Sequence, residues 1–417
     1  METEVLVHVD IGGVPRLVGR LWVHARKGRQ GASFQYEPEW LKCAQRFSLE
    51  PALVLDPGLF HASSGKPLFG AIGDSAPDRW GRALMRRAER QRQAGLRETP
   101  RALMEIDYLL MVDDEARQGA LRFARREDGP FLAEPRAGRI PPLIHLSRLL
   151  SAAEHVVDDT DDAEDLRLLL APGSSLGGAR PKASIRDRDG HLAIAKFPCK
   201  HDDVDVVLWE ALALTLAAKS GIGVPAWRLE RVMDRPVLLL RRFDRVEGQR
   251  IPFLSAMSML GAHDGEPRSY LEIVDALRRH GASPAQDMHQ LWRRIVFNVL
   301  ISNTDDHLRN HAFLYAGPDG WRLSPAYDLN PVPGDIKPRV LSTAIDLDDR
   351  SASLALAMSV AEYFDLDMGE ARDIAAEVGR ATATWRREAA QIGLTPTEIA
   401  RMAFAFEHED LRAARAL

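Results

Sequence analysis

Residues 303–310 read Asn303-Thr304-Asp305-Asp306-His307-Leu308-Arg309-Asn310, and Tyr327-Asp328 follows downstream. Asn310 stands five positions after Asp305, which is the spacing of the catalytic aspartate and the metal-binding asparagine in the protein-kinase motif H-R-D-x-x-x-x-N. Phosphoryl transfer needs a carboxylate that orients the attacking hydroxyl and oxygen ligands that hold Mg²⁺ on the phosphates. The pattern therefore indicates Asp305 as a candidate catalytic base, with Asn310 and Asp328 as candidate metal ligands.

The same octet has two further interpretations. His307 could bond a phosphate oxygen or brace the loop. Asn303-Thr304-Asp305-Asp306 is also typical of a solvated turn or of a helix N-cap, because short polar side chains accept hydrogen bonds from the first amide groups of a helix. Short motifs recur by chance, so the choice depends on the rest of the chain.

Composition narrows the class of protein. The chain has 417 residues, 45% hydrophobic and 28% charged, which is ordinary for a soluble globular protein of two or three domains. Cys43 and Cys199 are too few for a disulfide framework and lack metal-ligand spacing. Without a signal peptide or an apolar run of about 18 residues, we expect a cytoplasmic protein with no membrane partner. The net charge of −5 argues against nucleic-acid binding by the whole chain.

The N-terminal third mixes strands with an arginine-rich helix. Residues 5–9 and 17–23, joined through Gly12-Gly13, predict a β-hairpin, and residues 33–36 predict another strand. A helix running to about Gly95 is expected after Phe69, capped by Asp74 or Ser75 with Pro77 in its first turn. Its arginines, between Arg79 and Arg101, suit phosphates or an acidic partner; a solvated helix face is the alternative.

The middle of the chain holds a second group of residues that could bind phosphates. After a helix over 143–156 and an acidic run at 158–162, expected to be a solvated loop, comes Gly173-Ser174-Ser175-Leu176-Gly177-Gly178-Ala179-Arg180-Pro181-Lys182. Adjacent glycines suit an anion-binding loop, although a plain glycine turn explains them equally well. Two predicted strands follow, 183–186 and 191–197, with Lys196 near the end of the second. A strand lysine after a glycine loop is the kinase arrangement for binding the α- and β-phosphates.

The remaining elements fit the same plan. Glu210, on a predicted helix over 206–220, could pair with Lys196 or be a surface residue. Residues 235–245 read as a strand leading to a hinge against which the nucleotide base would lie, with Leu240 and Phe243 as candidate contacts. A buried helix over 291–300 leads into the octet, and helices are expected over 352–363, 368–391 and 395–404.

Taken together, the sequence resembles the HipA family, the serine/threonine-kinase toxins of bacterial toxin–antitoxin pairs. The resemblance rests on six segments in order: 34–41, 73–78, 175–182, 242–245, 304–310 and 327–328. It implies Asp305 as catalytic base, Asn310 and Asp328 as Mg²⁺ ligands and Lys196 as the phosphate-binding lysine. It further implies a loop over ATP, formed by residues 176–182 with Gly177, Gly178, Ala179 and Lys182, and autophosphorylation at Ser175.

The resemblance also implies partners. It predicts a helix-turn-helix antitoxin of the HipB type, operator DNA bound only through that antitoxin, and a protein substrate. Family members modify aminoacyl-tRNA synthetases, but Arg180-Pro181 and residues 251–257 depart from the family pattern, so the target is not carried over. A small-molecule phosphotransferase and an inactive co-repressor module are the alternatives from other classes.

The expected fold is α+β, a two-lobed protein-kinase-like (HipA-like) fold with an N-terminal α/β subdomain and a mostly helical C-terminal lobe. The expected boundaries are residues 1–125 for the N-terminal domain, 126–142 for a linker, 143–240 for the kinase N-lobe and 241–417 for the C-lobe.

Overall fold

The computed structural model describes residues 2–26, 29–96, 101–133, 140–170, 178–333 and 338–417. The chain divides into two compact units. The first comprises Met1–His201 and Leu229–Leu254, and the second comprises Asp202–Arg228 and Ser255–Leu417. The four-part division expected from the sequence stays a prediction.

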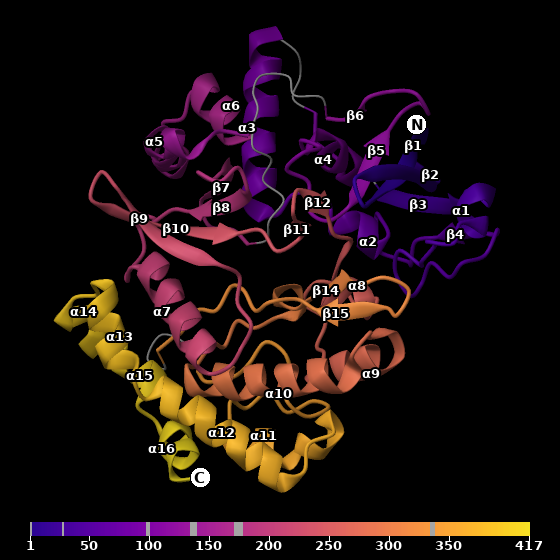
Figure 1. The fold of residues 1–417 in the computed structure, drawn as a ribbon. Helices are drawn as coiled ribbons and strands as arrows, with labels where there is room; N and C mark the ends of the chain where they lie inside the picture. The colour runs from indigo at the N-terminus through magenta and orange to yellow at the C-terminus, as the bar shows by residue number, and fades with distance from the viewer. Residues whose placement is uncertain (1, 27–28, 97–100, 134–139, 171–177, 334–337) are drawn as a thin grey trace. The chain divides into compact units, whose positions relative to one another are not determined.

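A six-stranded sheet opens the first unit, in the order β4-β3-β2-β1-β5-β6 (Figure 1). The predicted hairpin is confirmed, because β1 pairs antiparallel with β2 through a turn in which Gly12 and Gly13 have φ of 61° and 82°. Only glycine adopts such a backbone without steric cost. The strands are β1 (Glu2–Ile11), β2 (Val14–Arg26), β3 (Arg29–Tyr36), β4 (Leu59–His61), β5 (Leu121–Ala124) and β6 (Phe131–Leu132), and α1 spans Pro38–Lys42.

The arginine-rich helix is present, but its cap differs from the prediction. α3 spans Arg79–Leu96 and is preceded by the separate short helix α2 (Gly70–Gly73). Neither Asp74 nor Ser75 caps α3; the Asp78 carboxylate accepts the Gly81 amide hydrogen at 2.7 Å. Ser75 is buried and donates instead to the Ile72 carbonyl, because the end of α2 turns its hydroxyl inward. A further helix, α4, spans Glu105–Met111.

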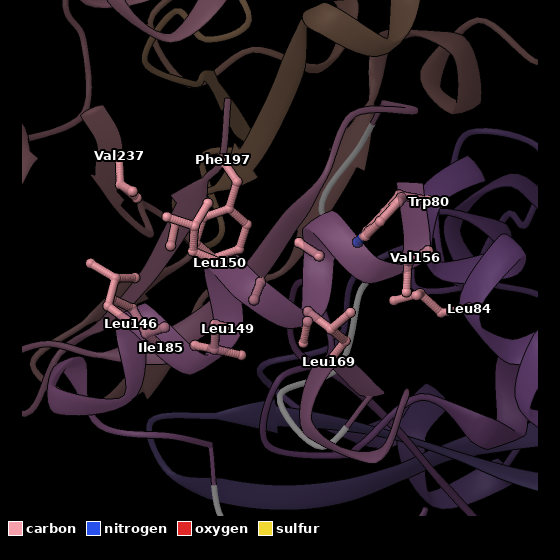
Figure 2. Packing of buried hydrophobic residues seen from close by; sticks show 14 of the residues in the cluster. Trp80, Leu84, Leu146, Leu149, Leu150, Val156, Leu169, Ile185, Phe197 and Val237 are labelled. Carbon is pink, nitrogen blue, oxygen red and sulfur yellow. The ribbon is translucent and has the colours of Figure 1, made fainter. Parts of the chain in front are cut away.

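The second sheet of the first unit has four strands in the order β7-β8-β10-β9. Its inner face packs on α3, α5 and α6 through a continuous apolar cluster that includes Trp80, Leu150 and Phe197 (Figure 2). The two strands predicted around the turn at Gly190, which has φ of 81°, are confirmed. The elements are η1 (Leu143–His145), α5 (Leu146–Val157), α6 (Ala163–Leu170), β7 (Lys182–Arg186), β8 (Leu192–Lys196), β9 (Trp227–Val232), β10 (Arg235–Arg241), β11 (Arg245–Val246) and β12 (Gln249–Arg250).

The acidic run between α5 and α6 is more than a solvated loop, which corrects the prediction. Arg87 of α3 forms ion pairs of 2.5 Å with both Asp159 and Asp161, and the Asp161 side chain is only 6% exposed. Lys200 pairs with Asp158 at 2.8 Å. Opposite charges thus hold together carboxylates that would otherwise repel one another.

The second unit is mostly helical. The predicted buried helix is α10, which spans Pro284–Leu300 and leads directly into the octet. One helix predicted over 368–391 is two helices, α12 and α13, because the backbone turns at Ala383-Thr384. Thr395 caps α14 as predicted. The helices are α7 (Val206–Lys219), α8 (Ala256–Met259), α9 (Tyr270–His280), η2 (Leu308–Asn310), α11 (Leu354–Ser359), η3 (Ala361–Phe364), α12 (Met368–Thr382), α13 (Trp385–Ile392), α14 (Pro396–Arg401), α15 (Ala403–Phe406) and α16 (Glu409–Ala416).

Two short strands complete the second unit. β14 (Ala312–Tyr315) follows the octet and pairs antiparallel with β15 (Trp321–Leu323), so the octet ends in a fixed strand. The chain passes from the first unit to the second within β13 (Phe253–Ser255). Among the described residues, we find no helix with both the length and the apolar character needed to span a bilayer.

Candidate active site

The octet is a loop with one turn and one short 3-10 helix rather than the cap of an α-helix. Along residues 305–310, Asp305, His307 and Arg309 are exposed, whereas their alternate neighbours Asp306, Leu308 and Asn310 are buried. Thr304 and Asp305 form a turn, and Leu308–Asn310 form the single 3-10 turn η2, whose N-cap residue is His307. The helix-cap interpretation of Asn303-Thr304-Asp305-Asp306 is therefore wrong, whereas a turn is present.

Asp306 anchors this loop from within. Its Oδ2 accepts hydrogen bonds from the Tyr270 hydroxyl at 2.5 Å and the Asn298 amide at 2.8 Å, and lies 2.7 Å from His311 Nε2. Burial opposes ionisation of this carboxyl, but the charge and hydrogen bond of His311, with the Tyr270 bond, outweigh burial and lower its pKa. Burial and the Asp306 charge together raise the pKa of Tyr270 well above its usual value. Through these three partners, Asp306 fixes the loop to α9, α10 and His311, the residue before β14.

Asp305 and Asn310 are joined through the backbone. The Asn310 side-chain amide donates to the Asp305 carbonyl at 3.2 Å, and the His307 amide donates to the same carbonyl at 2.9 Å. The Asp305 carboxylate accepts a long bond of 3.5 Å from the Ser342 hydroxyl. These bonds hold the Asp305 main chain while its carboxylate is exposed to solvent, as a base that receives a hydroxyl proton requires.

Asp328 lies on a segment that runs along the octet. Its neighbour Tyr327 donates its hydroxyl to the Arg309 carbonyl at 2.6 Å, and the Val332 amide donates to the Ser302 carbonyl at 3.1 Å. Asp328 has φ of 59°, in the left-handed region that non-glycine residues adopt at a cost. Tertiary contacts hold this conformation at the residue for which the sequence predicts a metal-ligand role.

The donor set fits magnesium. Asn310 and Asp328 offer one amide oxygen and one carboxylate, and Mg²⁺ is commonly bound by one or two carboxylates together with substrate phosphates. The described part of the chain holds no cluster of three or more His, Cys, Asp or Glu side chains with metal-site geometry.

In the first unit, the predicted phosphate-binding residues gather at one end of β7 and β8. Lys196 ends β8 and stands opposite Lys182 on β7 and Leu238 on β10. Lys182 is buried, and its ammonium lies 2.8 Å from the Asp78 carboxylate. Gly178 has φ of 90°, and Ala179 beside it is exposed. Ser175 and Gly177 lie outside the described residues.

The two predicted hinge contacts have different surroundings. Leu240 is buried on β10 opposite Ile194, and Phe243 is half-buried and stacked on Phe253 with ring centroids 6.5 Å apart. Next to them, Arg242 and Asp244 form a buried ion pair of 2.6 Å. Asp244 also accepts the Gly119 amide hydrogen at 2.8 Å, so this part of the predicted hinge clamps the loop before β5. Although burial raises it, the Arg242 and Arg245 charges hold the Asp244 pKa far below its usual range.

Glu210 lies on α7 and is 3% exposed, so it is not a surface residue. Its ion pair with Lys196 stays a prediction.

Sequence reasoning missed the residues that hold the loop, namely Asp306, Tyr270, Asn298 and His311. No local pattern singles out Asp306 and His311 as the residues that hold the loop. Asn298 stands only eight positions before Asp306, but no motif spacing links the two, and Tyr270 is 36 positions away.

Comparisons with known proteins agree with this architecture. The profile of the HipA-like C-terminal domain matches residues 174–385, about half of the chain. The chain therefore belongs to the family of proteins with a HipA-like C-terminal domain. The structure of the Shewanella oneidensis HipA, solved with HipB and operator DNA, superposes with a TM-score of 0.66 at 17% identity, over 99% of this chain and 96% of that one. The α+β, HipA-like fold predicted from the sequence is confirmed.

Two curated relatives are similar to this chain over less than half of its length. "Putative kinase Y4mE" of Sinorhizobium fredii is 30% identical over 199 residues, 40% of this chain and 46% of the relative. A "Putative kinase" of Haemophilus influenzae is 31% identical over 179 residues, 38% of this chain and 52% of the relative. The chain thus spans about half the length of the curated relatives it matches.

Proposed function

We propose that this protein is an ATP-dependent serine/threonine protein kinase of the HipA toxin type. The observation that carries the proposal is the loop at 303–310. There, buried Asp306 is hydrogen-bonded to Tyr270, Asn298 and His311, and its neighbour Asp305 is exposed. A carboxylate on such a fixed support costs little reorganisation during reaction, which favours a catalytic role over a solvated turn.

In this proposal each residue has one task. Asp305 orients the serine or threonine hydroxyl of the acceptor and receives its proton. Asn310 and Asp328 hold Mg²⁺, which neutralises charge on the phosphates when it is bound. Lys196 pairs with the α- and β-phosphates, and the glycine-rich residues 176–182 cover them. His307, exposed beside the base, is available to a phosphate oxygen.

Regulation and partners belong to the same proposal. Phosphorylation of Ser175 adds about −1.5 to −2 charges to the glycine-rich loop and would repel ATP, so self-modification switches the enzyme off. A helix-turn-helix antitoxin holds the protein and carries it to operator DNA. The support for this is the structural neighbour, which was solved with HipB and operator DNA. The substrate is a cytoplasmic protein, with an aminoacyl-tRNA synthetase as the first candidate to examine.

Comparative phosphoproteomics tests the proposal. Cells expressing the wild type should contain serine or threonine phosphopeptides that are absent from cells expressing Asp305→Ala at the same level. Identical phosphopeptides in both strains would reject protein-kinase activity. Transfer by the purified protein only to small acceptors would instead assign it to the small-molecule phosphotransferases.

A further inference from the structure

Two lysines of the first unit face each other across paired strands. Lys182 on β7 is the direct antiparallel partner of Lys196 on β8. Side chains at opposed positions lie on the same face of a sheet, and like charges there destabilise the pair. The Lys182 side chain is also only 3% exposed, and burial of an unpaired ammonium is costly. Its position opposite Lys196 therefore needs a nearby negative charge.

Asp78 supplies that charge with one carboxylate oxygen and caps a helix with the other. Its Oδ2 lies 2.8 Å from Lys182 Nζ, and its Oδ1 accepts the Gly81 amide hydrogen at 2.7 Å in the first turn of α3. The side chain is 4% exposed, so water does little to screen the pair. Both oxygens are used, which fixes the orientation of Lys182 relative to α3.

Trp80, two residues further along α3, holds the same strand end by its backbone. Its indole Nε1 donates to the Lys182 carbonyl at 3.0 Å, and its amide donates to the Gly178 carbonyl at 3.3 Å. The Trp80 ring is packed in the apolar cluster of the first unit (Figure 2). One tryptophan thus pins both ends of the segment Gly178–Lys182.

We propose that Asp78 and Trp80 are positioning residues for nucleotide binding. Lys182 then has a structural role, through its buried ion pair with Asp78, and is not a phosphate ligand. This rests on the proposed function, in which Lys196 and the glycine-rich loop bind the phosphates of ATP. Asp78 neutralises the lysine that faces Lys196, and Trp80 fixes the stem on which the loop turns. The segment 73–78, which resembles the family pattern but has no role in the chemistry, thereby acquires one.

A first experiment needs no nucleotide. Trp80→Phe keeps an aromatic ring and removes the indole hydrogen bond, and Trp292→Phe is a matched control. Trp292 is a fully buried tryptophan whose Nε1 donates to the Ala357 carbonyl at 3.0 Å in the second unit. Amide hydrogen exchange over residues 178–186 should accelerate about tenfold in Trp80→Phe and stay at the wild-type rate in Trp292→Phe. Unchanged exchange in Trp80→Phe would overturn the positioning role.

A second experiment measures affinity for Mg·AMP-PNP by calorimetry, below the melting temperature of each variant. Asp78→Asn retains a good helix cap and removes the charge. Asp367→Asn is the control, because Asp367 caps α12 in the same way and is exposed. Asp78→Asn and Lys182→Met should each weaken binding about tenfold, the double variant no further, and Asp367→Asn less than twofold.

The outcomes separate the two claims. Additive losses in Asp78→Asn/Lys182→Met would show that Lys182 contacts the nucleotide independently, which overturns its purely structural role. Wild-type affinity in Asp78→Asn would overturn the role of Asp78. A wild-type protein that fails to bind Mg·AMP-PNP would reject ATP binding itself, and the nucleotide-free exchange experiment would still decide whether α3 fixes the strand.

Discussion

Asp305 and Asp306 are adjacent in sequence but occupy opposite environments, one exposed to solvent and the other 2% exposed and bonded to Tyr270, Asn298 and His311. In the proposed mechanism the first carboxylate takes part in the reaction, and the second supports the loop that carries it. It also predicts that the two substitutions to alanine have different consequences.

Asp306→Ala should destabilise the protein. The change leaves three buried polar groups without their common acceptor, so we expect a loss of about 3 kcal/mol in the free energy of unfolding. Asp305→Ala, on an exposed side chain, should change this free energy by less than about 0.5 kcal/mol. Urea denaturation of both variants checks the contrast. Equal stabilities would show that the Asp306 bonds do not hold the loop.

Substitutions at Asp328 can separate the effect of its backbone conformation from its proposed role as a metal ligand. Its φ of 59° suits glycine and asparagine better than alanine. Asp328→Gly and Asp328→Asn should therefore be about 1 kcal/mol more stable than Asp328→Ala, while all three lose Mg²⁺-dependent transfer. Thermal melts and a transfer assay measure the two effects. Activity retained in Asp328→Gly, which keeps the backbone conformation and removes every side-chain ligand, would remove this residue from the metal site.

Glu50 gives the stability a specific pH dependence. Burial raises the pKa of its carboxyl from 4.5 to about 7, although the Ala71 amide donates to it at 2.6 Å. Because the folded-state pKa is the higher one, its stabilising contribution is complete below pH 4.5 and is lost as the pH rises through about 7. Glu50→Gln should thus be more stable than the wild type by up to about 3 kcal/mol above pH 7, and equal to it near pH 4.

The control for this prediction is Glu39→Gln, a change at an 86% exposed side chain on α1. Denaturation at several pH values should show a much larger pH dependence for Glu50→Gln relative to the wild type than for Glu39→Gln. A flat difference for Glu50→Gln would mean that Glu50 titrates normally in the folded protein.

The exposed arginines of α3 and the ion-paired Arg87 should affect the antitoxin-dependent binding of operator DNA differently. Arg86 and Arg90 are exposed, whereas Arg87 is bound to Asp159 and Asp161. Charge reversal at Arg86 and Arg90 should reduce the slope of log K against log salt by about two units, since each phosphate contact contributes about 0.9. Charge reversal at Arg87 should lower the melting temperature instead. An unchanged salt slope in the Arg86/Arg90 variant would assign both to a solvated face.

The parts of this structure that local sequence determines were predictable. Gly12-Gly13 between alternating apolar residues specified the hairpin, and the D-x-x-x-x-N spacing selected Asp305 as the candidate base. Contacts between distant segments were not predictable. The local pattern favours Asp74 or Ser75 as the cap of α3, whereas the cap is Asp78, whose partner Lys182 is 104 positions away. Similarly, the acidic run predicts a solvated loop, because its partner Arg87 lies 72 to 74 positions earlier.

The central claim is that Asp305 is the base of a phosphoryl transfer from ATP to a hydroxyl group of a protein. The most direct measurement is the incorporation of label from [γ-³²P]ATP into the purified chain with Mg²⁺, followed by mapping of the labelled peptide. We predict label on the segment containing Ser174 and Ser175, abolished by Ser175→Ala and reduced at least about 100-fold by Asp305→Asn, with a wild-type melting temperature in both variants. Incorporation by Asp305→Asn at the wild-type rate would contradict the account.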